Sequence, residues 1–236
     1  MILSALRTRL GELSGRFDLT VDNTALATFF INEGSKFLDR HSETQKTWAS
    51  NYSYLAVGGW NVQIPSCRAI KEVWVANTAS RWQLEKVDIQ EMLSNIMPQL
   101  ASSMTTGNPL YYSPAVTRQV PEAGTLPPGS ASYMDVLIST GYPYTAAIIA
   151  PPPNGQLLVD VRGLYYSAEF VADGDSNYWS VEHTGLLMKA ALREIEVFNR
   201  NRQGVKDWEA AIEVDLVSID KDLVEELIAE VNQMEG

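Results

Sequence analysis

The sequence predicts an α+β fold, in which a small helical bundle is built from the N- and C-terminal segments and is interrupted by a large β-rich insertion. Apolar residues recur every three or four positions near both ends of the chain, as along one face of a helix. In the middle the period falls to two, and β-branched and aromatic residues are frequent. The order helices, strands, helices is therefore typical of an α+β protein.

The expected domain boundaries follow from this order. The discontinuous bundle takes residues 1–50 and 175–216, the β-rich insertion takes 51–174, and an extended C-terminal helical arm takes 217–236. Within the insertion, residues 101–129 contain five prolines and several glycines. Because a loop of this length is usually functional or flexible, we expect a projecting element there.

The chain is acidic, and most of the excess charge lies near its C-terminus. The formal net charge is −11, and residues 206–236 hold ten acidic side chains against two lysines. An acidic surface repels phosphate, so sequence-specific DNA binding is not expected. The acidic stretch is either a solvated helix face or an arm that meets a basic partner. No stretch approaches the roughly 20 apolar residues that span a bilayer.

Two helices are expected in the N-terminal segment. The first runs from Leu3 to Leu13 and ends at Gly15. The second begins after Asp22, which is a good N-cap, and continues to about Arg40. Two helices joined by a short loop are expected to pack as an antiparallel pair.

The insertion is expected to begin with two short strands. Residues 52–57 and 60–64 flank a pair of glycines, which predicts a turn between the strands. Asp88 is expected to cap a helix that stops near Pro98. We expect further strands at residues 67–75, 82–87, 110–112, 133–139 and 144–150.

A strand and an acidic turn form the centre of the whole pattern. The strand runs from Leu157 to Tyr166 and is rich in residues that suit a half-buried sheet. Turn-forming residues follow at 173–177, and Asn177 is a plausible N-cap for the next helix. The aromatic residues that we expect in the core or at a subunit interface are Trp208, Trp179, Phe198, Tyr165 and Tyr166.

Two amphipathic helices are expected after the turn. On the first, apolar positions step by three and four. Lys189 and Arg193 share a face and are expected to face solvent, with contacts to acidic neighbours as the alternative. A glycine separates this helix from a second one at residues 205–216, after which Ser218 or Asp220 caps a separate last helix. That helix has too little core to be stable alone. Its apolar positions, expected to contact a partner, are Ile219, Leu223, Leu227, Ile228 and Val231.

No residue pattern predicts catalysis. Residues 173–177 place oxygen ligands at alternate positions, but Tyr178 and Thr184 stand where a calcium-binding EF-hand needs glycine and glutamate. No histidine is placed beside Cys67, which is therefore expected to be a buried strand residue. We predict a protein that is not an enzyme and has no metal or cofactor. A soluble hydrolase with a site at the turn is the alternative from another class.

Three parts of the chain carry a family resemblance. The C-terminal part contains residues 163–167, the acidic turn, and residues 177–179, 187–200 and 205–209. The N-terminal part is a short basic helix followed by residues 29–40, and the strand region contributes residues 64–73. These packing and turn patterns resemble the head-to-tail adaptor (connector) proteins of tailed bacteriophages. The resemblance covers most of the chain, is weak at residues 101–132, and includes no catalytic motif.

The resemblance implies a homo-oligomeric ring, commonly of twelve copies, that binds beneath the portal protein in the virion neck. Such a ring extends the DNA channel, lets DNA pass without sequence-specific binding, and offers a docking surface to a tail or nozzle protein. In related proteins the C-terminal tail grips the portal, and the acidic helix after Ile219 is the matching element here. Another virion ring protein, such as a tail terminator or nozzle subunit, stays open as an alternative.

Overall fold

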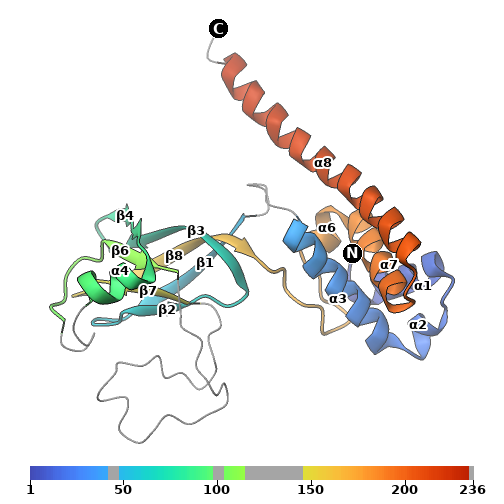
Figure 1. Cartoon of the computed structure of the whole chain (residues 1–236), viewed down its shortest axis with the longest axis horizontal. Coiled ribbons are helices and arrows are strands. Elements are labelled where there is room, and N and C mark those ends of the chain that lie inside the picture. The colour runs from blue at the N-terminus through green and yellow to red at the C-terminus, as the bar shows by residue number, and fades with distance from the viewer. Residues whose placement is uncertain (42–47, 98–103, 115–145, 234–236) are drawn as a thin grey trace, which may run out of the picture. The chain divides into compact units, whose positions relative to one another are not determined.

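The computed structural model has the α+β fold that the sequence predicts (Figure 1). It describes residues 1–41, 48–97, 104–114 and 146–233, with side chains up to Ile219 and that of Lys221. The chain divides into two compact units, which we call the helical unit (Met1–Thr47 and Tyr166–Gly236) and the β unit (Trp48–Tyr165). The strand expected at 133–139 and most of the loop at 101–129 lie outside the described residues.

The observed boundaries differ slightly from the expected ones. The boundaries between the helical and β-rich parts were expected after residues 50 and 174. In the structure they lie after residues 47 and 165. Residues 166–174 leave the sheet and bond to helix α3, so they belong to the helical unit. Sequence periodicity does not reveal this, because an irregular segment has no period of its own.

Six helices are described in the helical unit, and both chain ends contribute to them. The N-terminal helices are α1 (Leu3–Ser14), α2 (Asp18–Val21) and α3 (Thr24–His41). The C-terminal helices are α6 (Tyr178–Glu182), α7 (Thr184–Phe198) and α8 (Arg202–Gln233). Helix α1 ends as expected at Gly15, whose φ of +68° suits a residue without a side chain. Helix α2 was not predicted, because four residues are too few to show a period.

The apolar stripes read from the sequence form one core in the helical unit. Helix α1 contributes Leu3, Leu6 and Leu10, which are fully buried. Helix α7 contributes Leu187 and Ile195, among others, to the same hydrophobic cluster. The two ends of the chain are therefore joined by shared burial of apolar side chains, the main favourable contribution to folding.

Helices α3 and α7 approach closely at Gly34, and replacing Gly34 with alanine is expected to destabilise the helical unit. The added Cβ would lie 2.8 Å from the backbone nitrogen of Ala191 and 3.0 Å from the carbonyl carbon of Ala190. Because these are backbone atoms, the helices would have to separate, at a cost of about 2 kcal/mol. Urea denaturation followed by circular dichroism measures the change. The control is Gly185→Ala, where the new Cβ has no neighbour within 4 Å, and an equal loss in both variants would contradict the prediction.

Helix α8 is continuous, so the expected break near residues 216–220 is wrong. One helix runs from Arg202 to Gln233. Ser218 does not act as an N-cap, because its hydroxyl donates a hydrogen bond back to the carbonyl of Asp215 within the same helix. Good capping residues in a sequence thus did not mark a helix start here.

The β unit contains two four-stranded sheets. The first has the order β1-β8-β3-β4 and the second has the order β2-β7-β6-β5. The strands of the first sheet are β1 (Trp48–Leu55), β3 (Cys67–Ala76), β4 (Arg81–Gln83) and β8 (Leu157–Tyr165). Those of the second are β2 (Asn61–Gln63), β5 (Glu85–Lys86), β6 (Tyr111–Ser113) and β7 (Ala146–Ala150). The strand predicted at 157–166 is therefore β8, between β1 and β3.

Two strand predictions in the β unit are corrected. The first two strands do not pair about their glycine turn, because β1 pairs with β8 and β2 pairs with β7 in the other sheet. The strand expected at 82–87 is two strands, since the chain changes sheets within it. The Leu84 nitrogen donates to the carbonyl of Val73 in the first sheet, and the next nitrogen, of Glu85, donates to that of Leu110.

A short helical segment follows the strand β5. Asp88 caps α4 (Ile89–Glu91) as predicted, accepting a hydrogen bond from the backbone nitrogen of Gln90. A π-helical turn, η2 (Met92–Ile96), continues it. Buried Met92 and Met97 pack there with Ile148 and Ala150 of β7.

Candidate assembly surfaces

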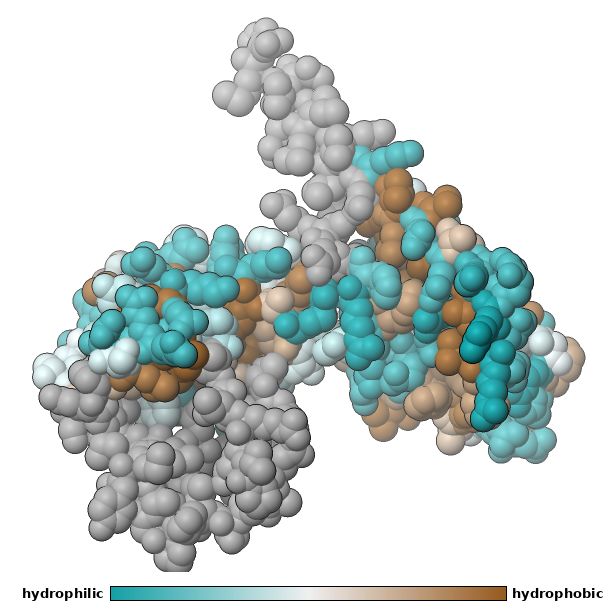
Figure 2. Space-filling model, in the orientation of Figure 1, coloured by the Kyte–Doolittle hydropathy of each residue, from teal (hydrophilic) through white to brown (hydrophobic). Residues whose placement is uncertain are grey.

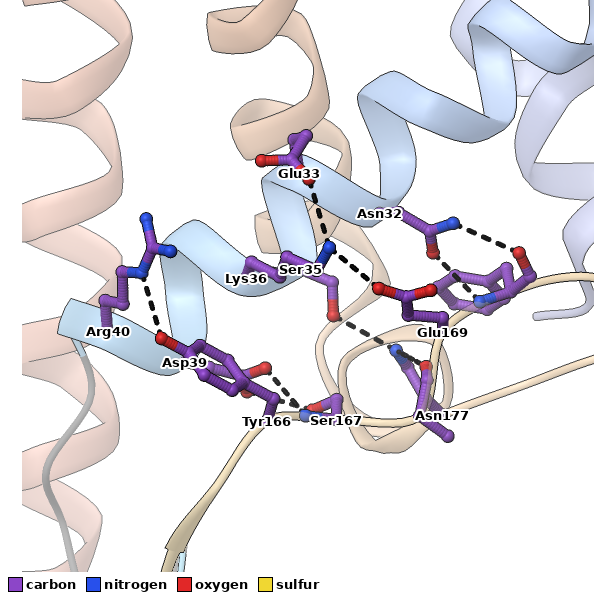
Figure 3. A network of polar contacts seen from close by, with 12 residues as sticks. Asn32, Glu33, Ser35, Lys36, Asp39, Arg40, Tyr166, Ser167, Glu169 and Asn177 are labelled. Carbon is purple, nitrogen blue, oxygen red and sulfur yellow. Dashed lines mark hydrogen bonds and ion pairs between the residues drawn. The ribbon is translucent and has the colours of Figure 1, made fainter. Parts of the chain in front are cut away.

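A segment that we call the strap, residues 166–177, carries the chain from β8 into the helical unit and bonds along α3 (Figure 3). Asn32 makes two hydrogen bonds to the backbone of Phe170: its Nδ2 donates to the carbonyl at 3.0 Å, and its Oδ1 accepts from the nitrogen at 2.9 Å. Lys36 pairs with Glu169 of the strap at 2.7 Å. These bonds replace the regular secondary structure that the strap lacks.

Asp39 of α3 is the central acceptor of this network. Its carboxylate accepts from the backbone nitrogen of Ser167 at 2.7 Å and from the hydroxyl of the same residue at 2.9 Å. It also accepts from the indole nitrogen of Trp179 at 2.7 Å. Trp179, expected in the core or at a subunit interface, is fully buried in the core of the helical unit. One buried carboxylate thus joins α3, the strap and α6.

Tyr166 begins the strap and contacts the end of α3. Its hydroxyl accepts a hydrogen bond from Arg40 Nε at 3.2 Å, and the guanidinium carbon lies 5.7 Å from the centre of its ring. Hydrogen bonding to this hydroxyl raises the pKa of Arg40. Tyr165, the preceding residue, belongs to the β unit, where it packs against the core and donates to the carbonyl of Val161 at 2.9 Å. Burial raises the pKa of Tyr165.

The acidic turn at 173–177 is held by protein donors. Asp173 pairs with Arg7 of α1 at 2.6 Å. Asp175 accepts from the backbone nitrogens of Val171 and Ala172, and these two bonds lower the pKa of Asp175. Asp173 therefore joins the turn to α1, and Asp175 holds the backbone just before the turn. Within the described part of the chain, no cluster of three or more His, Cys, Asp or Glu side chains could hold a metal ion.

Two further residues that the sequence singled out, Asn177 and Cys67, have structural roles. Asn177 caps α6 as predicted, in a reciprocal arrangement with Ser180. Cys67 is buried in β3, as expected, and burial raises the pKa of its thiol. A raised pKa keeps the thiol protonated, the form that is not nucleophilic.

Ion pairs fix the first half of α8 against α7. Lys189 pairs with Asp215 at 2.6 Å, and Arg193 pairs with Glu209 at 2.7 Å. Both basic residues therefore contact acidic neighbours, which is the alternative to their facing solvent. Arg193 also contacts Glu194 and lies 4.3 Å above the ring of Phe37. Burial alone would lower the pKa of Arg193, but its bonds to the two glutamates outweigh this and raise it.

The two ion pairs also set the register between the helices. Lys189 pairs with Asp215, whereas Arg193, which comes later in α7, pairs with Glu209, which comes earlier in α8. The two helices therefore run antiparallel. In this register the first residue of α7, Thr184, lies opposite about residue 220 of α8. The part of α8 after that point continues beyond α7, as Figure 1 shows.

Ile219 lies in the core of the helical unit, so its expected role in a partner-binding arm is corrected. It is 6% exposed and joins the same core cluster as Ile212. The side chains of the other expected arm residues, Leu223, Leu227, Ile228 and Val231, lie outside those that the structure describes. Trp208 is partly buried against the core.

Helix α8 has a second apolar surface, which was not predicted from the sequence. Hydrophobic residues lie on the surface of α8 before the residues drawn in grey (Figure 2). Val214 is 71% exposed and Val217 is 52% exposed. Together with the exposed Ala210 they form what we call the outer stripe of α8. These residues are four and three positions apart, which is a spacing that places them on one face of a helix. The pattern was overlooked because α8 also has the apolar stripe that packs on α7.

Another exposed apolar surface, distinct from the outer stripe, lies where α3 meets the end of α7. Phe29 is 54% exposed and Phe198 is 58% exposed, and both rings contact the buried ring of Phe30 edge-on, at 5.9 and 5.6 Å. With the exposed Val197 they form what we call the phenylalanine patch. Phe198 is therefore a surface residue, in contrast to Trp179.

Comparisons with known proteins do not assign the chain. No model of a known protein family matches it, and no curated protein sequence matches it. Among the residues that the structure describes, no helix combines the length and the apolar character needed to cross a membrane.

Proposed function

We propose that the protein is a structural virion protein that forms an adaptor ring between the portal and the tail of a tailed bacteriophage. The ring extends the DNA channel, and DNA passes through it without sequence-specific binding. The β unit offers a docking surface to the next tail or nozzle protein. The resemblance to adaptor proteins supports this proposal, as does a helical unit that is split by a β-rich insertion. The resemblance lies in residues 29–40, 64–73, 163–167, the acidic turn, 177–179, 187–200 and 205–209.

The observation that carries the proposal is the length of α8. Helix α8 has 32 residues and α7 has 15, which correspond to about 48 Å and about 22 Å. A single helix that leaves its own core is not stable in water by itself. We therefore assign residues 222–236 as an arm whose apolar positions are buried on the portal.

The charge of this arm indicates the kind of surface that it binds. Residues 222–236 contain five acidic residues and neither lysine nor arginine. An acidic arm favours a basic groove, and it disfavours DNA, whose phosphates bind where basic groups release their counterions. Acidic side chains near the channel would let DNA slide without adhering.

Deleting residues 222–236 is expected to abolish attachment to portal-bearing heads while leaving the protein folded. The last buried residue of α8, Ile219, is retained, and so are the ion pairs at Asp215 and Glu209. Negative-stain electron microscopy of portal-bearing particles mixed with each protein measures attachment, and circular dichroism measures folding.

A second variant tests the charge of the arm separately from its length. Replacing Glu225, Glu226 and Glu230 with glutamine keeps the arm but removes three charges, so attachment is expected to weaken and to lose much of its dependence on salt. Attachment of the deletion variant at the level of the full chain would contradict the arm assignment. A full chain that shows neither rings nor particle binding would overturn the adaptor function.

A further inference from the structure

We infer that in the free protein the strand β1 pairs with β1 of a second copy, so that the first sheets of the two copies join into one continuous sheet. The inference goes beyond the proposed ring, because a contact between two identical surfaces closes on itself as a pair. It concerns the protein before it joins the portal, and it depends on residues of the β unit alone.

The strand β1 is an edge of unusual length in this protein. It has eight residues and lies at one end of the first sheet, where β8 is the only described strand that pairs with it. The other described edges of the two sheets are short, because β4 and β2 have three residues each and β5 has two. Proteins commonly protect sheet edges by making them short, charged or bulged, since an open edge is a template for another strand.

None of these protections is present in β1. Trp48–Leu55 contains no charged residue and no proline. All eight residues pair with β8 in a single register, so this ladder has no bulge. The side chains of Tyr52 and Tyr54 are 63% and 73% exposed. The free side of such a strand presents backbone donors and acceptors in a row, and these match the backbone of another extended strand.

Two observations identify that strand as β1 of a second copy. Two edges of equal length cover each other completely, and within the described part of the chain no other edge approaches the length of β1. Because β1 has no charged residue, pairing it with itself places no like charges opposite each other, which would be destabilising.

An unpaired hydroxyl on β1 sets the register of the contact. The Ser53 oxygen is buried and has no hydrogen-bond partner among the described residues. Antiparallel pairing centred on Tyr52 places Asn51 of the second copy directly opposite Ser53, on the same face of the sheet. The amide nitrogen of Asn51 can then donate to the Ser53 oxygen, and the two-fold axis repeats this bond in the other copy. On the opposite face, Tyr52 lies beside Tyr52 of the second copy, and Tyr54 lies beside Ser50.

Cysteine cross-linking of the full chain tests this register. Tyr52→Cys is expected to form a disulfide dimer under mild oxidation, because residue 52 faces its own equivalent with about 5 Å between the Cβ atoms. Tyr54→Cys is the matched control, since residue 54 of the second copy would lie about 13 Å further along the strand. We expect roughly tenfold more dimer from Tyr52→Cys than from Tyr54→Cys alone. Mixing Tyr54→Cys with Ser50→Cys is expected to give a mixed dimer, while native Cys67 stays buried.

Charges placed at the axis test the contact without oxidation. Size-exclusion chromatography with light scattering at micromolar concentration is expected to give the mass of a dimer for the unmodified protein. Tyr52→Lys places two lysines opposite each other and is expected to raise the dissociation constant about tenfold, and mixing it with Tyr52→Glu is expected to restore the dimer. Gln83→Lys adds the same charge to exposed β4 at the other edge of the same sheet, and is expected to leave the dimer unchanged.

An unmodified protein that stays monomeric at tens of micromolar would overturn the inference and would leave the β1 edge to a strand of another protein. Equal cross-linking of Tyr52→Cys and Tyr54→Cys would overturn it as well, because the two copies would then not pair about Tyr52. The adaptor function is tested separately by attachment to portal-bearing heads.

Discussion

Replacing Asp39 with alanine is expected to lower the free energy of unfolding of the helical unit by about 3–4 kcal/mol. The Asp39 carboxylate accepts hydrogen bonds from the nitrogen and hydroxyl of Ser167 and from the indole of Trp179. Alanine leaves the indole nitrogen without this acceptor inside the core, where an unpaired donor keeps its full desolvation cost. The strap also loses its attachment to α3 at Ser167.

Urea denaturation followed by circular dichroism measures the loss, and hydrogen exchange locates it. Exchange is expected to accelerate in α3 and in the strap, and to stay unchanged in β8. Ser167→Ala is the matched control, because it removes one of the three bonds and leaves the backbone bond at 2.7 Å in place; we expect it to cost about 1 kcal/mol. If Asp39→Ala costs no more than Ser167→Ala, the carboxylate is not the central acceptor.

Replacing Gly163 with alanine is expected to destabilise the β unit by about 3 kcal/mol or more. A Cβ at this position would lie 2.1 Å from the carbonyl oxygen of Ala69 in β3. The ladder between β3 and β8 shifts its register twice around this point, between Cys67 and Ala69 and between Ile70 and Glu72. Such an irregularity brings the backbones together where only glycine fits.

The measurement for Gly163→Ala is hydrogen exchange combined with thermal unfolding. We expect faster exchange in β3 and β8 and a lower transition temperature, with α7 protected as in the unmodified protein. Gly155→Ala serves as the control, since its new Cβ meets nothing within 4 Å. A Gly163→Ala protein as stable as this control would show that β3 and β8 do not approach as described.

Local patterns predicted the long elements well. Helices α1, α3 and α7 and the strand β8 follow from apolar periodicity, because each is long enough to repeat its pattern and buries one face. Asn177 and Asp88 were identified as caps because capping is a local interaction between a side chain and nearby nitrogens. The α+β class followed from the order of these elements.

Pairing and surface exposure could not be predicted in the same way. The partner of β2 is β7, which lies more than 80 residues away along the chain, and periodicity carries no information about a distant partner. Ile219 and Val217 are both apolar residues of α8, but the structure buries the first and exposes the second. The sequence alone does not show which residue of α8 lies opposite the start of α7. It therefore could not show which apolar residues of α8 belong to the core and which belong to the arm.

The split of the helical unit has a consequence for the nascent protein. Leu3 and Leu6 of α1 share their core with Leu187 of α7, which leaves the ribosome only after the whole β unit. Chains fold domain by domain as complete units emerge. The β unit is complete at Tyr165 and so folds first. Until α7 emerges, the apolar faces of the N-terminal helices stay exposed to solvent. At that stage the growing chain is a natural client for a chaperone.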